Sequence, residues 1–466
     1  MVMAEASTLE NQAWAGALAA ACRLGDGKRQ RRLTGLLAAF GARPQASIPD
    51  ACGNWADTKA AYRFLGNPHV TVQALTEGFG VAAAQAGAGR PLMLAVSDTT
   101  TINLSGLNVE GLGPVNDSAA AKGVHLHTVL AVDPQGFCLG VLDQQFWVRP
   151  PRGTATPAAT RPFEEKESAK WVHAIDAARA RLHETLGPAA PEILHVMDRE
   201  GDVWETLQTI DDWGERAVIR ATQDRRTSDP ERTAYAAVRA QSPLAVTALE
   251  LPAAPGRAAR TATVEVRVLN AELQPDPRKH PAGWPMAWTL LEILEPEPPS
   301  GTAALHWRLW TREPAGTLAE ALLVLCWYML RWRIEDFHFT LKSGCQVERL
   351  KLETLPGLLK ALALRSATAA RVLALRDRAR QQPEAPAAVL LTLAEMQVLW
   401  AAQHRRPMPA GTPLPTLREA ALWVGRLGGH LNRKGDGMPG VRTLWRGLAA
   451  LSRLVEGHRL ARMTIP

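Results

Sequence analysis

The pattern of apolar and polar positions divides the chain into a helical beginning, a middle built around strands, and a helical end. Residues 1–70 show helical spacing, as in LGDGKRQRRLTGLLAAF, and helical spacing returns from Thr317 onward. Three short apolar runs follow the first helical part: PLMLAVSDTT, HLHTVLAVD and FCLGVLDQQFWV. Because turn residues such as DPQG separate runs of this length, the pattern predicts an antiparallel meander of strands.

The segments after this meander predict a helix, a strand, a helix and a further strand. EEKESAKWVHAIDAARARLHETL has a helical period, PEILHVMDREGD contains an apolar run that ends in an acid, and GERAVIRAT is another short strand. This order is typical of a ribonuclease-H-like α/β core. Strand-like runs such as TATVEVRVLN then occupy residues from about 225 to 305 and predict a β-rich insertion.

Composition and charge narrow the class of protein. Of the 466 residues 46% are hydrophobic and 21% charged, and the sequence has neither a long uncharged apolar run nor a signal-peptide pattern at its start. These features predict a cytoplasmic globular protein. Five scattered cysteines without a CxxC pair disfavour a disulfide framework and a structural zinc site. A net charge of +7 suits a polyanionic partner, although many basic proteins bind no nucleic acid.

Two acids stand where apolar strands are predicted to end. Asp98 follows the run LAVS, and Asp198 follows LHVM. Ligands of α/β folds bind at the carboxyl ends of strands, which makes both acids candidates for a metal site. An aspartate after a strand is also a common turn or helix-cap residue, so neither position is informative by itself.

A stripe of four polar side chains adds more weight, in the segment WYMLRWRIEDFHFTLKSG. Tyr328 is taken as zero on a helix that advances about 100° per residue. Arg331, Glu335 and Lys342 then fall at roughly −60°, −20° and −40°, on the same face. The alternative is a set of solvated side chains on an amphipathic helix, which leaves the mixture of one acid with two cations unexplained.

These residues resemble the bacterial DDE transposases of the insertion-sequence-four family. The family signature Y-x2-R-x3-E-x6-K is matched by Tyr328, Arg331, Glu335 and Lys342, and its two aspartates are matched by Asp98 in DTT and Asp198 in DREGD. Further similarity is found in LGDGKRQRR and AAYRFLGNPHV near the start, EEKESAKW in the middle and LWRGLAAL near the end. The resemblance therefore runs over nearly the whole chain.

The resemblance implies a cut-and-paste transposase that nicks DNA, forms and opens hairpins at the transposon ends, and joins these ends to target DNA. Its catalytic residues would be Asp98, Asp198 and Glu335, holding two Mg²⁺ ions for which Mn²⁺ would substitute. Carboxylates suit Mg²⁺, and two such ions can serve the nucleophile and the leaving oxygen together. No Walker A loop is present, so no use of ATP is expected.

Nine side chains are expected to contact DNA: Tyr328, Arg331, Lys342, Trp307, Lys28, Arg29, Arg32, Arg63 and His338. Trp307 matches the family's base-stacking tryptophan, and the alternative is a core tryptophan at the end of a strand. The cluster of Lys28, Arg29, Arg31 and Arg32 at a helix start can meet phosphates, although from this stretch alone a solvated helix face is the slightly favoured explanation.

The resemblance also implies three domains. They are a helical domain over 1–70 that binds the DNA ends, a catalytic domain over 71–375 that contains the insertion, and a helical dimerisation domain over 376–466. The expected partners are transposon-end DNA, target DNA and a second copy of the chain, with no membrane; in the cell the protein would lie with the bacterial nucleoid when DNA-bound. Two alternatives are a DNA-binding protein that has lost catalysis and a nuclease that cuts without joining.

Overall fold

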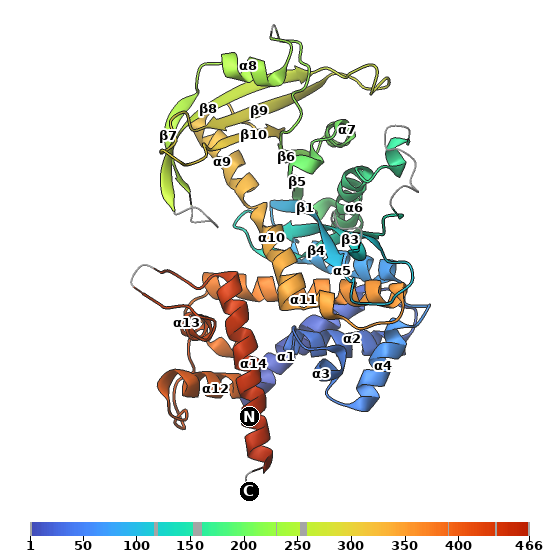
Figure 1. Cartoon of the computed structure of the whole chain (residues 1–466), viewed down its shortest axis with the longest axis vertical. Helices are drawn as coiled ribbons and strands as arrows, with labels where there is room; N and C mark the ends of the chain where they lie inside the picture. Colours follow the sequence, from blue (N-terminus) through green and yellow to red (C-terminus); the bar gives the residue numbers. More distant parts are fainter. Residues whose placement is uncertain are drawn as a thin grey trace.

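A mixed sheet of ten strands runs through the middle of the protein, with helical regions from both ends of the sequence packed below it (Figure 1). The computed structural model describes residues 2–115, 120–151, 161–229, 231–251, 259–389, 391–433 and 436–464. Along the sheet the strands follow the order β2-β3-β1-β5-β6-β10-β9-β8-β7, and β4 pairs with β3. The strands are β1 (Leu92–Asn103), β2 (Gly113–Pro114), β3 (Lys122–Val132), β4 (Cys138–Trp147), β5 (Glu192–Met197), β6 (Arg216–Arg220), β7 (Ala245–Leu251), β8 (Arg260–Leu273), β9 (Met286–Leu294) and β10 (His306–Thr311).

Five of these strands, in the order β4-β3-β1-β5-β6, form the ribonuclease-H-like core predicted from the sequence. β3 lies antiparallel to β1 and β4, whereas β5 lies parallel to both β1 and β6. The parallel strands are connected through α6 (Ala169–Leu186) and α7 (Trp204–Trp213). The predicted order of three strands, helix, strand, helix and strand is therefore confirmed.

The β-rich insertion continues the core sheet. β10 pairs with β6 and β9, and β8 pairs with β9 and β7, all antiparallel. Within the insertion, the helix α8 (Ala234–Ala240) packs on β8 and β9, and the insertion forms one end of the molecule in Figure 1. The sequence predicted strands here but did not predict that they would extend the catalytic sheet.

Alternation along β1 explains how both faces of the core sheet are covered. Met93 and Ala95 pack with apolar residues of α5 (Val72–Ala86) and α6. Leu94 and Val96 belong to a larger apolar cluster that includes side chains of helices after residue 317, such as Leu325, Phe337 and Leu362. Since successive side chains of a strand point to opposite faces, a strand buried on both sides must be apolar throughout, as residues 92–96 are.

Helices from the two ends of the chain meet below the sheet. The N-terminal region contains α1 (Val2–Ala21), α2 (Gly27–Ala42), α3 (Ile48–Cys52) and α4 (Trp55–Leu65). The later helices are α9 (Leu318–Met329), α10 (Trp332–Phe339), α11 (Leu355–Gln381), α12 (Leu393–His404), α13 (Leu417–Leu427) and α14 (Val441–Thr464). No helix among the described ranges has the length and apolar character needed to cross a membrane.

The long helix α11 lies between the sheet and the N-terminal helices (Figure 1). The Nζ of Lys360 donates to the carbonyl oxygens of Leu65 and Asn67, at 2.9 and 2.8 Å. The guanidinium of Arg365, which is 1% exposed, donates to the carbonyl oxygens of Pro44 and Ala46 at 2.7 and 2.6 Å. These contacts fix the N-terminal helical region onto α11. The helix also runs through the domain boundary that was expected near residue 376, so the two neighbouring parts share it.

Candidate active site

The two aspartates lie side by side on parallel strands. In the pairing of β1 with β5, Ser97 is opposite Met197. Asp98 directly follows Ser97, and Asp198 directly follows Met197. β1 itself does not end there, because it continues to Asn103 through its pairing with β3. The expectation that Asp98 terminates its strand is therefore wrong, but the parallel part of the strand does end at this point. Asp198 also accepts a hydrogen bond from the Glu200 N–H at 2.9 Å, so the helix-cap role considered for it is real as well.

The helix that was expected to carry all four signature residues is broken twice. α9 ends at Met329, a tight turn follows, and α10 begins at Trp332. A π-helical turn, Thr340–Gly344, then replaces the regular continuation of α10. The indole N–H of Trp445 in α14 donates to the Thr340 hydroxyl at 3.4 Å beside this turn. The regular stripe calculated for one straight helix is therefore wrong, because turns of different pitch rotate the later residues.

Arg331 nevertheless joins the acids of the site. Its Nη2 donates to Glu335 Oε1 at 2.7 Å, and its Nη1 lies 3.9 Å from Asp98 Oδ2. The Arg331 side chain is only 12% exposed, which strengthens both interactions relative to a pair in water. The structure thus brings the first aspartate to the signature arginine and the glutamate, although Asp98 lies more than two hundred residues before these two in the sequence.

The pKa of Asp98 reflects its burial first and the negative charges beside it second. Burial raises the pKa of Asp98 to about 7, and the neighbouring carboxylates of Asp198 and Glu335 add to this rise. The Thr99 N–H, 2.7 Å from Asp98 Oδ1, and the Arg331 guanidinium oppose it. Burial also raises the pKa of Asp198. Removing carboxylates from water disfavours their charged form unless a cation is close.

This charge balance fits a divalent cation. Three carboxylates face one guanidinium in the site, and their oxygen atoms are the donors that Mg²⁺ prefers. Over the described ranges, no three His, Cys, Asp or Glu side chains stand close enough to form a ready metal site in this conformation. Glu335 is hydrogen-bonded instead to Arg331, a cation of the protein itself.

Aromatic and basic side chains surround the acids. The rings of Trp307 on β10 and Tyr328 on α9 meet edge to face, with centroids 5.9 Å apart. The guanidinium of Arg220, at the end of β6, lies 5.8 Å from the Trp307 ring. Trp307 is half-buried, which leaves part of its ring at the surface. Arg331 stands 5.2 Å from the ring of Trp332, which is 58% exposed.

Two of the side chains expected to contact DNA, Lys342 and His338, are partly or largely buried. Lys342 lies on the π-helical turn, where burial lowers its pKa and the nearby Glu348 raises it. His338 is 8% exposed and points into the interior, where burial lowers its pKa to about 3. His338 is therefore largely enclosed by the protein, and its contact with DNA stays a prediction.

The N-terminal basic residues divide into engaged and exposed groups. Arg32 forms an ion pair with Asp57 at 2.9 Å, and Arg29 donates to the carbonyl oxygen of Leu24 at 2.7 Å. Lys28 and Arg63 are exposed. Of the expected set, Lys28 and Arg63 are therefore the side chains most open to a phosphate backbone.

Comparison with known protein families gives two matches, one at each end of the chain. Residues 11–70 match the family described as Transposase DNA-binding, and residues 367–465 match the family described as Transposase Tn5 dimerisation domain. The two matched regions enclose a ribonuclease-H-like core with paired aspartates. These two matches support a Tn5-like transposase of the insertion-sequence-four family.

The transposase thus has a DNA-binding region and a dimerisation region, while Asp98, Asp198 and Glu335 lie between the two matched ranges. Two residues of this central part were missed by sequence reasoning. Arg220 ends a predicted strand next to the one that leads to Asp198, a position that could have drawn attention to it. Trp332 gave no signal in the sequence, because its exposure depends on the break between α9 and α10.

Proposed function

We propose that this transposase excises its transposon by cut-and-paste chemistry, with hydrolysis and transesterification of phosphodiesters at a two-metal site formed by Asp98, Asp198 and Glu335. The observation that carries the proposal is the contact of Arg331 with both Asp98 and Glu335 beside Asp198. A site of this kind lies at the edge of parallel strands, where α/β folds place their chemistry.

The metal ions would be Mg²⁺, with Mn²⁺ as a substitute, and when bound they would supply charge neutralisation for the reacting phosphate. The protein's own side chains would do the rest. Arg331 offers two parallel N–H donors to phosphate oxygens once a cation takes over its place beside the carboxylates. Tyr328 would position the neighbouring phosphate, and Lys342 would add a point charge further along the strand.

Hairpin formation requires a distorted duplex, with a base moved out of the stack. The half-buried ring of Trp307 offers a stacking surface close to Tyr328, and Arg220 brings a cation to the same place. Base stacking on an aromatic ring contributes about 1–3 kcal/mol, enough to compensate a large part of unstacking. Trp307 is therefore the residue proposed to receive the displaced base.

Transposon-end DNA would bind along the N-terminal region. Lys28 at the start of α2 and Arg63 on α4 are exposed, and Trp55 at the start of α4 is 78% exposed. Exposed cations and an exposed indole in one helical region are features that surfaces binding nucleic acid use. Target DNA would then be joined in a complex of two copies of the chain, without ATP.

The deciding experiment uses a labelled duplex that carries the terminal repeats flanking the gene, with Mg²⁺. Wild type should give nicks, hairpins and joined products, whereas Glu335→Ala should bind the duplex without cutting it. Glu200→Ala is the matched control, because Glu200 is an exposed acid next to Asp198 that pairs with Lys170. It should cut like wild type.

Each alternative gives a different result. Binding of the end duplex without any cut by wild type would support a DNA-binding protein that has lost catalysis. Nicks without joined products would support a nuclease that cannot join. Metal-dependent nicking that persists in Glu335→Ala would remove Glu335 from the site.

A further inference from the structure

The orientation of α10 is not set by continuity with the helical segments on either side of it. α10 spans only Trp332–Phe339, after a turn at its start and before a π-helical turn at its end. At about 100° per residue, Arg333 and Asp336 lie roughly 160° and 100° around the axis from Glu335. The helix thus presents Glu335 to the catalytic acids on one face and a charged pair on the others.

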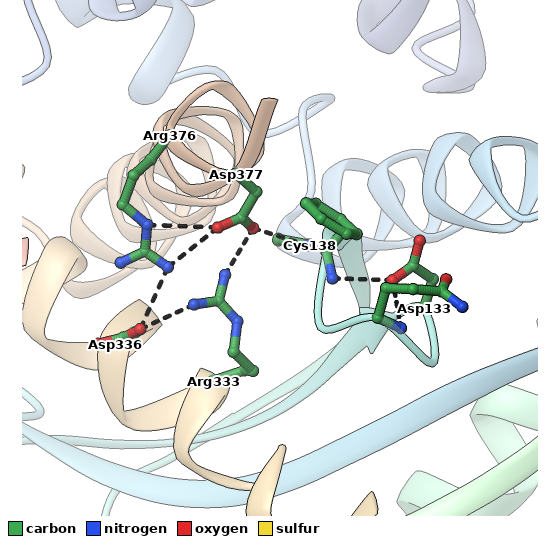
Figure 2. A network of polar contacts seen from close by, with 8 residues as sticks. Asp133, Cys138, Arg333, Asp336, Arg376 and Asp377 are labelled. Carbon is green, nitrogen blue, oxygen red and sulfur yellow. Dashed lines mark hydrogen bonds and ion pairs between the residues drawn. The ribbon is translucent and has the colours of Figure 1, made fainter. Parts of the chain in front are cut away.

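That pair belongs to a clasp of four residues: Arg333, Asp336, Arg376 and Asp377 (Figure 2). Arg333 donates to Asp336 at 2.9 Å and to Asp377 at 2.5 Å. Arg376 donates to Asp336 at 3.2 Å and to Asp377 at 3.1 Å. Two guanidinium groups of two helices therefore alternate with two carboxylates of the same helices.

Three of the four side chains of the clasp are buried, and the fourth, Asp336, is 35% exposed. The side chains of Arg333, Arg376 and Asp377 are 11%, 8% and 4% exposed. Interactions between charges in such surroundings are much stronger than on a surface, and removal of one partner leaves an uncompensated buried charge. Rotation of α10 about its axis would break several of these contacts together.

The clasp is also tied to the sheet that carries the first aspartate. Asp377 accepts a hydrogen bond from the N–H of Cys138, the first residue of β4, at 3.1 Å. The turn before it is held by Asp133, which accepts from the Phe137 N–H at 2.9 Å, and Asp133 lies beside Cys138 in Figure 2. Since β4 pairs with β3 and β3 with β1, the clasp relates α10 to the strand of Asp98.

Arg376 and Asp377 lie in the region that matches the dimerisation domain, which begins at residue 367. We infer that these two residues of the dimerisation region are positioning residues for the active site, because through Arg333 and Asp336 they hold α10 so that Glu335 faces Asp98 and Asp198. This inference rests on the proposed function, which makes Glu335 a metal ligand. It assigns to the dimerisation region a task within its own subunit, in addition to contact with a second copy.

The test is Mn²⁺ binding, measured by electron paramagnetic resonance on the full-length protein with a pre-cleaved end duplex, so that the readout does not depend on cutting. The variants are Arg376→Gln and Asp377→Asn. Arg376→Gln keeps the ion pair between Arg333 and Asp377, so it is the milder change and is read alone if Asp377→Asn does not fold. Arg260→Gln is the matched control, because it breaks an ion pair with Glu295 of similar burial in the insertion, away from α10.

We expect the apparent dissociation constant for Mn²⁺ to rise at least fivefold in both clasp variants and to recover in large part in Arg376→Lys. Arg260→Gln should bind Mn²⁺ like wild type even if its melting temperature falls as far. Clasp variants that bind Mn²⁺ like wild type, while Glu335→Gln loses an ion, would overturn the inference and leave the proposed function intact. Unchanged binding in Glu335→Gln would overturn the proposed metal site and the inference together.

Discussion

Replacement of Asp98 by asparagine should make the metal-free transposase more stable at neutral and alkaline pH. Burial raises the pKa of Asp98 from its ordinary 3.8 to about 7, so between these values the folded protein keeps a proton that the unfolded chain has released. Stability therefore falls as the pH rises through this window and stays low above pH 7. Asparagine has no charge to bury and still offers an oxygen to the Thr99 N–H.

The size of the effect follows from the pKa. A change of one in pKa corresponds to about 1.4 kcal/mol, so the rise to about 7 represents about 4 kcal/mol as an upper figure. The side chain of Asp98 is 20% exposed, so screening by solvent is limited. For a chain of 466 residues, such a gain raises the melting temperature by roughly 4 °C.

The assay is thermal unfolding in EDTA, followed by tryptophan fluorescence at several pH values for wild type and Asp98→Asn. The melting temperatures should agree near pH 4 and diverge up to pH 8, with the variant higher. Addition of Mg²⁺ should narrow the difference, since an ion present at a hundred times its dissociation constant stabilises the protein that binds it by about 2.7 kcal/mol. Equal melting temperatures at pH 8 in EDTA would refute the assignment of a buried, uncompensated carboxylate at this position.

Three further outcomes are expected. Trp307→Ala should impair hairpin formation at least tenfold more than the first nick in a gel assay of both steps, whereas equal loss would indicate a folding role. Charge reversal of Lys28 and Arg63 should weaken binding of the end duplex and lower the slope of log affinity against log salt by about two, and an unchanged slope would make both residues part of a solvated surface. Gly344→Ala should lower the melting temperature by an amount equivalent to about 1–3 kcal/mol, because a β-carbon there would lie 2.5 Å from the ring of Trp445, and a thermal melt equal to wild type would show that the ring moves freely.

Patterns local in sequence predicted the sheet and its acids. The apolar runs that end near Asp98 and Asp198 lie in neighbouring parallel strands, as an alternation of strands and helices requires. The break between α9 and α10 was not predictable, since nothing between Tyr328 and Trp332 is a helix breaker. For the same reason the sequence could not reveal that His338 is buried.

The engagement of the N-terminal arginines illustrates a second limit. A basic cluster in a sequence shows the charge but not the partners that folding supplies. Arg32 forms an ion pair with Asp57, and Arg29 donates to the carbonyl oxygen of Leu24. Both partners lie outside the cluster. The family resemblance supplies part of this missing information, because it indicates which of several similar basic residues are expected to contact DNA.

The anchoring of the N-terminal region by Lys360 and Arg365 has a consequence for how this protein can evolve. All four acceptors of these two cations are backbone carbonyl oxygens, of Leu65, Asn67, Pro44 and Ala46. A carbonyl oxygen is the same whatever side chain its residue bears. Substitutions at the outward side chains of α2 and α4 therefore leave these hydrogen bonds to α11 in place. The surface proposed to bind DNA can change in evolution without a change in how the N-terminal region is attached to the rest of the protein.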